Sequence, residues 1–310
     1  MSTVHRAQAS APASVGNVGV GFDLLGHGFE GPRDRVVATR RSTPGVRIIA
    51  IHGADQDLPT AIDENTAGRA VQSLLAARAP TLGIDLELFK GIPLAAGMGG
   101  SAASAVAAAA AANALLPEPL PLPELYRHTL DGEAVAAGAR TGDNVGSQLL
   151  GGLVLATPDR LIRLDVPDDL HCALVRPHLR LATRQSRAVL EQPWPLADIV
   201  SQTTALALFL TGCQRSDYML IADGLRDVLV EPRRAPLIPG FARVKQAALA
   251  AGALGASISG AGPSVFAWCR GQDVARRAAA AMADGFAEVG LPCSQWTAPV
   301  AGEGVRLEPA

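Results

Sequence analysis

The segment from Pro93 to Ser104 contains the residue types that phosphate-binding loops use. Gly97, Gly99 and Gly100 lead into Ser101, where a long helix is predicted to begin. Glycine lets the backbone adopt positive φ and approach a ligand closely, and the free N–H groups at a helix N-terminus favour an anion. Two interpretations remain open for this segment alone, a phosphate-binding turn and an ordinary strand-to-helix connection.

Two common nucleotide-binding motifs do not fit this turn. A Walker A motif ends in Gly-Lys-Ser/Thr, and the turn contains no lysine. A dinucleotide-binding fingerprint needs another glycine spacing, with an acidic residue about 20 residues later. The alanine run that follows, from Ala102, is about 15 residues long and contains Ser104 and Asn113, so it is too short and too polar for a membrane span.

The composition is that of a folded globular enzyme or binding protein. The 310 residues are 48% hydrophobic and 18% charged, and the net charge of −2 gives no bulk attraction to nucleic acid or to an anionic membrane. The N-terminus has no apolar signal region, so we expect a cytoplasmic protein. The four cysteines are far apart and predict neither a disulfide framework nor a zinc site.

Strand-like and helical stretches alternate along the chain, which predicts a mixed α and β protein. In the first half we expect strands at 35–39, 46–51, 84–89, 152–157 and 161–166, and helices at 65–78, 101–116 and 122–139. In the second half we expect strands at 172–176, 264–269 and 294–297, and helices at 183–190, 196–211, 217–229, 241–251 and 273–289. We place a domain boundary between them, which gives domains 1–167 and 168–310.

Two further glycine-rich stretches accompany the turn, APASVGNVGVGFDLLGHG at 11–28 and GALGASISGAGPSVFAW at 252–268. In order and spacing the three stretches resemble the motifs of the GHMP kinases. TGDNV at 141–145, TRQSR at 183–187 and EPRRAPLIPGF at 231–241 are similar to the homoserine kinases in particular. The resemblance covers nearly the whole chain.

The resemblance implies a two-domain α+β fold, with an N-terminal half like ribosomal protein S5 domain 2 and a ferredoxin-like C-terminal half. It implies ATP-dependent phosphorylation of L-homoserine in threonine biosynthesis, in a cleft between the halves, by a protein that is commonly a homodimer. It assigns Mg²⁺ to Ser101 and Glu133, although Glu133 could also be a solvated residue of its helix. It places the ATP phosphates on Pro93, Ala96, Gly97, Met98, Gly99, Gly100, Ser101, Ala102 and Ala103.

L-Homoserine is a zwitterion with a distal hydroxyl, and residues of the similar motifs match its groups. Asp23 suits the ammonium group, and Arg187 and Arg234 present planar guanidinium groups to the carboxylate. Asn17 and Asn144 can hold the hydroxyl end. The alternatives are that Asp23 caps a turn, that the arginines are surface charges, and that Asn17 only tolerates a left-handed backbone.

The proton chemistry depends on two neighbouring residues. Some GHMP kinases pair a catalytic Asp with a Lys of the first motif, but Ser14 stands at that place here, which disfavours such a base. Either Asp143 or Asn144 could face the hydroxyl, because neighbouring side chains of a helix cannot both point to the substrate. Asp143 resembles an N-cap for a helix at 144–150, which favours Asn144 at the hydroxyl. Catalysis by Asn144, Thr183 and Arg187 would then rest on alignment and electrostatic stabilisation, with the proton leaving through a phosphate oxygen or a relay that includes Thr183.

The chain departs from the family pattern at two places. Gly100 stands where the family usually has a serine, and Thr141-Gly142 replaces the usual His-Pro. Asn65 is expected to contact the adenine or to cap a helix. Lys90 is expected to approach the nucleotide or to be an exposed residue at a strand end. We expect the third glycine stretch, Ser259 to Ser264, to brace the phosphate loop.

Two other functions remain possible from the sequence. One is another GHMP kinase of the mevalonate, diphosphocytidyl polyol or shikimate type, although Asp23 would then lack an ammonium partner. The other is a non-catalytic GHMP-fold protein that binds a nucleotide or a partner. The presence of both Ser101 and Glu133 argues against the second.

Overall fold

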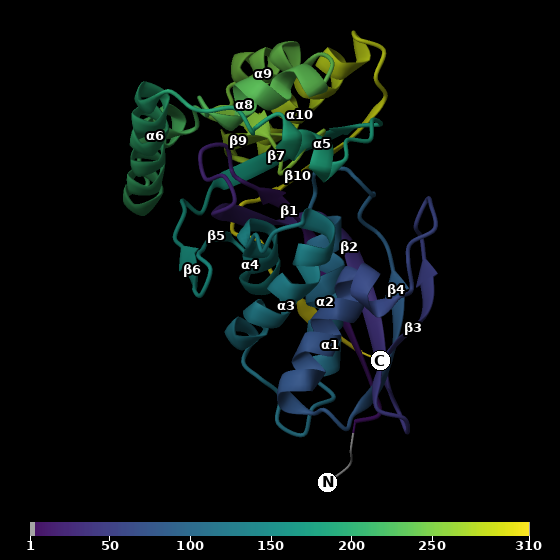
Figure 1. Ribbon diagram of the computed structural model, residues 1–310. Coiled ribbons are helices and arrows are strands. Elements are labelled where there is room, and N and C mark those ends of the chain that lie inside the picture. The colour runs from purple at the N-terminus through teal and green to yellow at the C-terminus, as the bar shows by residue number, and fades with distance from the viewer. Residues whose placement is uncertain (1–3, 310) are drawn as a thin grey trace.

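Two separate β-sheets organise the chain, and helices cover each of them (Figure 1). The structure is a computed structural model that describes residues 4–309, so the first three residues of the N-terminal segment, in which we expect no apolar signal region, lie outside it. The sheet formed mainly by the first half of the chain lies below the other sheet in Figure 1. The fold is therefore the two-part α+β architecture that the resemblance implies.

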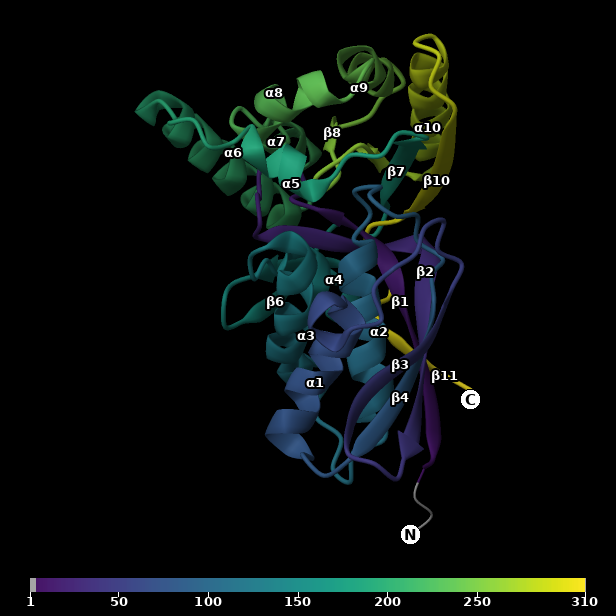
Figure 2. The same cartoon turned by 45° about the vertical axis from the view of Figure 1, so that its right-hand side comes forward.

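The N-terminal sheet has seven strands in the order β11-β1-β2-β4-β3, with β5 paired to β2 and β6 to β5. Only β3 and β4 pair in parallel among these strands. The helices of this half lie on one face of the sheet (Figure 2). The strands are β1 (Arg6–Gly16), β2 (Leu25–Arg41), β3 (Gly45–His52), β4 (Gly83–Phe89), β5 (Leu153–Ala156), β6 (Leu161–Leu164) and β11 (Arg306–Glu308). The helices are η1 (Ile62–Glu64), α1 (Thr66–Arg78), α2 (Gly100–Asn113), α3 (Leu122–Ala137) and α4 (Asp143–Leu150).

The C-terminal sheet has four antiparallel strands in the order β10-β7-β9-β8. The strands are β7 (Leu170–Pro177), β8 (Gly255–Ile258), β9 (Val265–Arg270) and β10 (Cys293–Pro299). The helices are α5 (Thr183–Ala188), α6 (Leu196–Arg215), α7 (Tyr218–Gly224), α8 (Val230–Arg234), η2 (Ala235–Leu237), α9 (Phe241–Ala250) and α10 (Gln272–Ala287). Side chains of α9 and α10 form the core over this sheet.

The alanine run forms the buried helix α2. Every residue from Ala102 to Asn113 on this helix is buried. Because alanine carries only a methyl group, α1 and α3 can approach α2 closely on one side while β1 and β2 approach it on the other. The alanine run is thus the central helix of the N-terminal core, which agrees with our rejection of a membrane span there.

A different helix, α6, is long and apolar enough by length and composition to cross a membrane. Most of α6 is exposed, and it projects from the side of the C-terminal half in both views (Figures 1 and 2). Length and composition are weak evidence for a membrane helix when only one helix meets them.

Most predicted elements are present, and the ends of most are shifted by a few residues. The strand expected at 35–39 is the last part of β2, which begins ten residues earlier at Leu25, and β8, β11 and α8 were not expected. The helix expected at 217–229 is shorter and ends at Gly224. Strand β1 was not expected, because RAQASAPASVG is rich in small residues with low β-propensity. The expected boundary at 167–168 lies between β6 and β7, but β11 pairs with β1, so the end of the chain returns to the N-terminal sheet.

Candidate functional site

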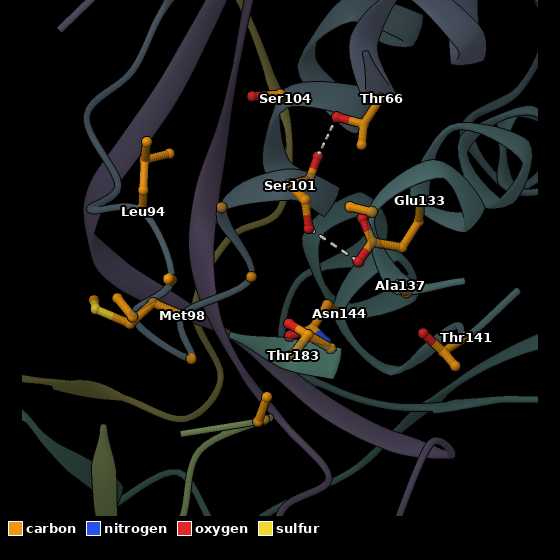
Figure 3. A pocket seen from close by; sticks show the side chains of 18 of the residues that line it. Thr66, Leu94, Met98, Ser101, Ser104, Glu133, Ala137, Thr141, Asn144 and Thr183 are labelled. Atoms are coloured by element: carbon orange, nitrogen blue, oxygen red, sulfur yellow. Dashed lines mark hydrogen bonds between the residues drawn. The ribbon is translucent and has the colours of Figure 1, made fainter. Parts of the chain in front are cut away.

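A cavity of about 340 Å³ lies where the two halves of the chain meet. Its wall includes the phosphate-loop candidates from Pro93 to Ser101 together with segments from both glycine-rich companions. Figure 3 shows Ser101, Glu133, Asn144 and Thr183 around one space, although they come from different elements. The predicted site residues that line it are Asn17, Asp23, Asn65, Lys90, Pro93, Ala96, Gly97, Met98, Gly99, Gly100, Ser101, Glu133, Asn144, Thr183, Arg187 and Arg234.

The turn before α2 has a backbone that only glycine adopts easily. Gly97 has φ of 71° and Gly99 has φ of 69°. A Cβ at Gly97 would lie 2.5 Å from the carbonyl oxygen of Ser259, and Ser259 Oγ donates a hydrogen bond of 2.7 Å to the carbonyl oxygen of Gly97. The third glycine stretch therefore braces the turn, as we expected.

The first two residues of α2, Gly100 and Ser101, line the cavity, and the N–H groups in the first turn of a helix have no partner within the helix. The N-cap of α2 is Gly99, which has no side chain to accept a hydrogen bond from them. A Cβ at Gly100 would lie 3.3 Å from Ile92 Cγ2, so Ile92 takes up the space beside the position where the family usually has serine. Ala102 and Ala103 were expected to bind ATP, but both are completely buried in the core and do not line the cavity.

Ser101 and Glu133 meet across the cavity. Ser101 Oγ, on α2, donates a hydrogen bond of 3.0 Å to Glu133 Oε1, on α3 (Figure 3). Glu133 Oε2 is buried and has no hydrogen-bond partner among residues 4–309. Burial raises the pKa of Glu133 to about 8, although the hydrogen bond from Ser101 opposes the shift. Glu133 is therefore not a solvated surface residue.

Asp23 and Arg187 form a two-pronged ion pair between the two halves of the chain. Arg187 Nη2 lies 2.9 Å from Asp23 Oδ1, and Arg187 Nη1 lies 3.1 Å from Oδ2. Neither residue is a simple surface charge or turn cap. The centre of the Phe22 ring lies near two guanidinium groups, 5.6 Å from that of Arg187 and 5.2 Å from that of Arg234.

Arg234 is held by backbone carbonyl groups. Its Nε donates to the carbonyl oxygen of Ser186 at 3.0 Å, and its Nη1 donates to that of Gly260 at 2.9 Å. Burial, assisted by the nearby charge of Arg187, lowers the pKa of Arg234 to about 10, so it stays cationic at neutral pH. The site thus holds two guanidinium groups and one aspartate in close proximity.

Asn17 and Asn65 use their side chains to hold backbone. Asn17 has φ of 68°, accepts a hydrogen bond from the Asp23 N–H and donates to the Gly260 carbonyl oxygen at 2.9 Å. Asn65 caps α1, because its side chain accepts a hydrogen bond of 3.0 Å from the Ala67 N–H. Capping was the alternative expected for Asn65 beside a contact with the adenine. Both line the cavity, but their contacts favour roles in shaping its wall.

The expected capping role of Asp143 is wrong. Helix α4 begins at Asp143 itself, and its N-cap is Gly142. The Asp143 carboxylate instead accepts hydrogen bonds from the Asn17 N–H at 3.1 Å and from Asn144 Nδ2 at 3.2 Å. Burial, and then the negative charge of Asp23, raise the pKa of Asp143 to about 6. Asp143 and Asn144 both line the cavity, although only one of these neighbouring side chains was expected to face it. Both side chains also lie close to Gly16, at the end of β1.

Lys90 is not an exposed residue at a strand end. Its ammonium group is buried and donates to Asp34, to the carbonyl oxygen of Gly100 at 2.8 Å and to Ser104 Oγ at 2.8 Å. Thr183, by contrast, is exposed at the first residue of α5 and faces the cavity from the C-terminal half.

Sequence reasoning missed three residues of the site. The Phe22 ring contacts both arginines, Thr66 Oγ1 donates to the Ser101 carbonyl oxygen at 3.0 Å, and Asp34 binds Lys90. Phe22 precedes Asp23 in the first glycine stretch and was available as a signal. Asp34 lies in a strand with no motif around it, so nothing in the sequence identified it.

Two family models match the chain. The model described as GHMP kinases N terminal domain matches residues 65–152, and the model described as GHMP kinases C terminal matches residues 206–288.

Curated proteins and solved structures are similar over almost the entire chain. A homoserine kinase of Xylella fastidiosa (strain M12) is 54% identical over 98% of this chain and 95% of its own length. One of Xanthomonas campestris pv. campestris (strain B100) is 54% identical over 98% and 94%. A crystal structure of homoserine kinase from Cytophaga hutchinsonii has a TM-score of 0.95 at 36% identity and covers 99% of both chains. A crystal structure of L. major mevalonate kinase, at a TM-score of 0.66 and 16% identity, shares the fold.

Proposed function

The chain belongs to the GHMP kinase family, and from this we propose that it transfers the γ-phosphoryl group of ATP to the hydroxyl of L-homoserine. The product is O-phospho-L-homoserine, and the reaction is the phosphorylation step of threonine biosynthesis. One observation carries the proposal: a single cavity contains a phosphate-type turn, a Ser–Glu pair, and an Asp–Arg–Arg group suited to an amino acid.

The turn and α2 bind the triphosphate. Gly97 and Gly99 have no side chain, which permits their positive φ and lets a ligand approach the backbone, and the uncapped N–H groups at the start of α2 donate to phosphate oxygens. The cavity is also lined by Leu58, Pro59 and Leu88, whose apolar side chains suit a base. Asn65 borders the same space and supports it by capping α1.

Ser101 and Glu133 would hold Mg²⁺. The buried Oε2 of Glu133 has no hydrogen-bond partner in the described part of the chain, and hydroxyl and carboxylate oxygens are ligands that Mg²⁺ prefers. No cluster of three or more His, Cys, Asp or Glu that could hold a metal occurs among residues 4–309. Mg²⁺ in kinase sites is commonly bound by one or two protein ligands together with substrate phosphates and water, which would supply the remaining ligands here. When bound, the cation neutralises charge on the transferring phosphoryl group.

The ion pair of Asp23 and Arg187 selects a zwitterion. A ligand that carries both charges can offer its carboxylate to Arg187 and its ammonium group to Asp23. Each residue would then replace its partner in the ion pair with an oppositely charged group of the ligand. Arg234 adds a second cation beside the carboxylate. An alcohol without an ammonium group, such as mevalonate, would leave Asp23 without its partner, which is costly in a half-buried site.

Asn144 and Thr183 hold the reacting hydroxyl. The Asn144 amide is fixed by two hydrogen bonds, from Ser14 Oγ at 2.8 Å to its Oδ1 and from its Nδ2 to Asp143 at 3.2 Å. This supports in-line alignment of the hydroxyl with the γ-phosphate, and the proton leaves through a phosphate oxygen or through Thr183. No strong general base is needed in this scheme, because positioning and charge stabilisation supply most of the rate of phosphoryl transfer.

The substrate proposal has a direct test. ADP release should be measured with Mg-ATP and, in turn, L-homoserine, mevalonate, shikimate and L-serine. We expect turnover with L-homoserine only, because its ammonium and carboxylate groups match Asp23 and Arg187 and its chain places the hydroxyl near the phosphates. Turnover of mevalonate without turnover of L-homoserine would refute the proposal, and ADP binding without turnover of any alcohol would favour a non-catalytic protein.

A cytoplasmic homodimer completes the proposal. All four cysteines are free, which suits a reducing compartment. Helix α6 exposes Leu196, Ile199 and Val200, and its only charged residue before Arg215 is Asp198. A nearly uncharged face of this kind can be covered by the same face of a second copy about a two-fold axis.

A negative charge placed on the exposed apolar face of α6 is expected to disrupt the proposed dimer. Val200→Glu should convert the dimer to a monomer in sedimentation equilibrium, because a carboxylate would be buried at the contact without a partner. Leu307→Glu, at an exposed apolar position on β11, is the matched control and should leave the dimer intact. A Val200→Glu protein that remains dimeric would exclude α6 as the interface.

A further inference from the structure

A buried ion pair lies behind the phosphate loop. Lys90 follows strand β4 and Asp34 lies in β2, and their side chains are only 4% and 1% exposed. The three N–H groups of the Lys90 ammonium have three acceptors in the protein: Asp34 Oδ2, the Gly100 carbonyl oxygen and Ser104 Oγ. The substrate scheme above uses neither residue.

Asp34 connects the same ammonium group to the loop itself. Its Oδ1 accepts hydrogen bonds of 3.0 Å from the N–H groups of Gly91 and Ile92. Its Oδ2 accepts from Ser104 Oγ at 2.8 Å, in addition to Lys90. The pair thus ties together β2, the segment that opens the phosphate loop, and the first turn and a half of α2.

These contacts fix where α2 begins. Gly100 is the first residue of the helix, and the next residue, Ser101, supplies the hydroxyl that pairs with Glu133. Lys90 holds the Gly100 carbonyl group, while Asp34 holds Ile92, whose side chain packs against Gly100. A shift of either contact would rotate the N–H groups that face the cavity.

Stability alone is a poor reason for such a pair. The desolvation cost of two buried charges commonly cancels their attraction, and apolar replacements are often as stable. We propose that Lys90 and Asp34 are positioning residues that aim the N-terminus of α2 at the β- and γ-phosphates of the nucleotide. The inference rests on the proposed binding of ATP at this loop.

Binding of ADP and AMP tests the inference, since AMP lacks the β-phosphate. Calorimetry should give Kd for both nucleotides with wild-type protein and with Lys90→Met, which keeps the length of the side chain but removes its charge. We expect the ratio Kd(AMP)/Kd(ADP) to fall by about tenfold in the variant, because one misaligned charge-assisted contact has about that effect. AMP affinity should change little.

The other lysine of the chain provides the control. Lys245 pairs with Glu231 away from the cavity, so Lys245→Met should leave the ratio at its wild-type value. Ser104→Ala removes the hydroxyl that contacts both Lys90 and Asp34, so it should lower the ratio by a smaller factor than Lys90→Met. Alanine is a good helix former, so this variant provides the test if Lys90→Met does not fold.

Asp34→Asn separates positioning from direct contact. If Lys90 bound the phosphates itself, freeing its ammonium group from Asp34 would strengthen ADP binding, whereas the positioning role predicts weaker ADP binding. The inference would be overturned by stronger ADP binding in Asp34→Asn, or by an unchanged ratio in folded Lys90→Met and Ser104→Ala proteins. In either case, ADP binding by the wild-type protein would still support the proposed function. Wild-type protein that binds no ADP would overturn both.

Discussion

Glu133→Gln is expected to lower kcat by on the order of 100-fold, because an amide cannot supply the anionic ligand that holds Mg²⁺ beside the phosphates. Glutamine has the same size and can still accept the hydrogen bond from Ser101 Oγ, so the shape of the cavity should persist. Initial rates measured over a range of Mg²⁺ concentrations should show that the variant needs far more Mg²⁺. Glu124→Gln, at an exposed position on the same helix, is the control and should behave as wild type. Unchanged turnover in Glu133→Gln would refute the metal assignment.

Glu133→Gln is expected to maintain or raise the stability of the folded chain, although it lowers kcat. Burial raises the pKa of Glu133 from 4.5 to about 8 in the folded chain. Between these two values the folded chain retains a proton that the unfolded chain has released, so the contribution of Glu133 to the free energy of unfolding falls as the pH rises. Glutamine has no such dependence. Without Mg²⁺ and nucleotide, the variant should therefore have a Tm at pH 8 that is equal to or higher than that of wild type, and the difference should shrink toward pH 5.

The sequence predicted the parts of the site that lie in local motifs. The glycines of the turn predicted its positive φ, and the alanine run predicted a helix packed inside protein. These features depend on neighbours in sequence, because a turn and the helix after it are formed by consecutive residues. The resemblance then supplied Asp23 and Arg187, which the structure brings into direct contact.

Contacts between distant segments could not be predicted in the same way. Nothing near Asp34 indicates that it binds Lys90, because the pairing depends on the register of β2 against β4. Asp143 resembles a helix cap because it precedes a helical stretch in the sequence, but α4 includes it. Its carboxylate accepts a hydrogen bond from the backbone N–H of Asn17, which is far away in the sequence. Strand β1 escaped prediction because its alanines and serines become strand-like only between β2 and β11.

Arg187→Ala should lower kcat/KM for L-homoserine by about 100-fold, since hydrogen bonds to a charged group contribute about 1.5–3 kcal/mol each and this guanidinium group presents two donors to a carboxylate. The loss should lie mainly in KM, and Kd for ADP should stay within about twofold of wild type, because no contact joins Arg187 to the phosphate loop among the hydrogen bonds of residues 4–309.

Arg184→Ala is the matched control for this prediction. Arg184 lies on the same helix, α5, but its side chain is exposed and does not line the cavity. Its kinetics should equal those of wild type. Arg187→Ala also leaves Asp23 without a cation, so a double variant, Arg187→Ala with Asp23→Asn, should recover stability without recovering the affinity for L-homoserine. If the double variant recovered that affinity, Asp23 would not bind the ammonium group. If Arg187→Ala lost ADP binding and L-homoserine binding equally, the ion pair would shape the entire cleft instead of selecting the substrate.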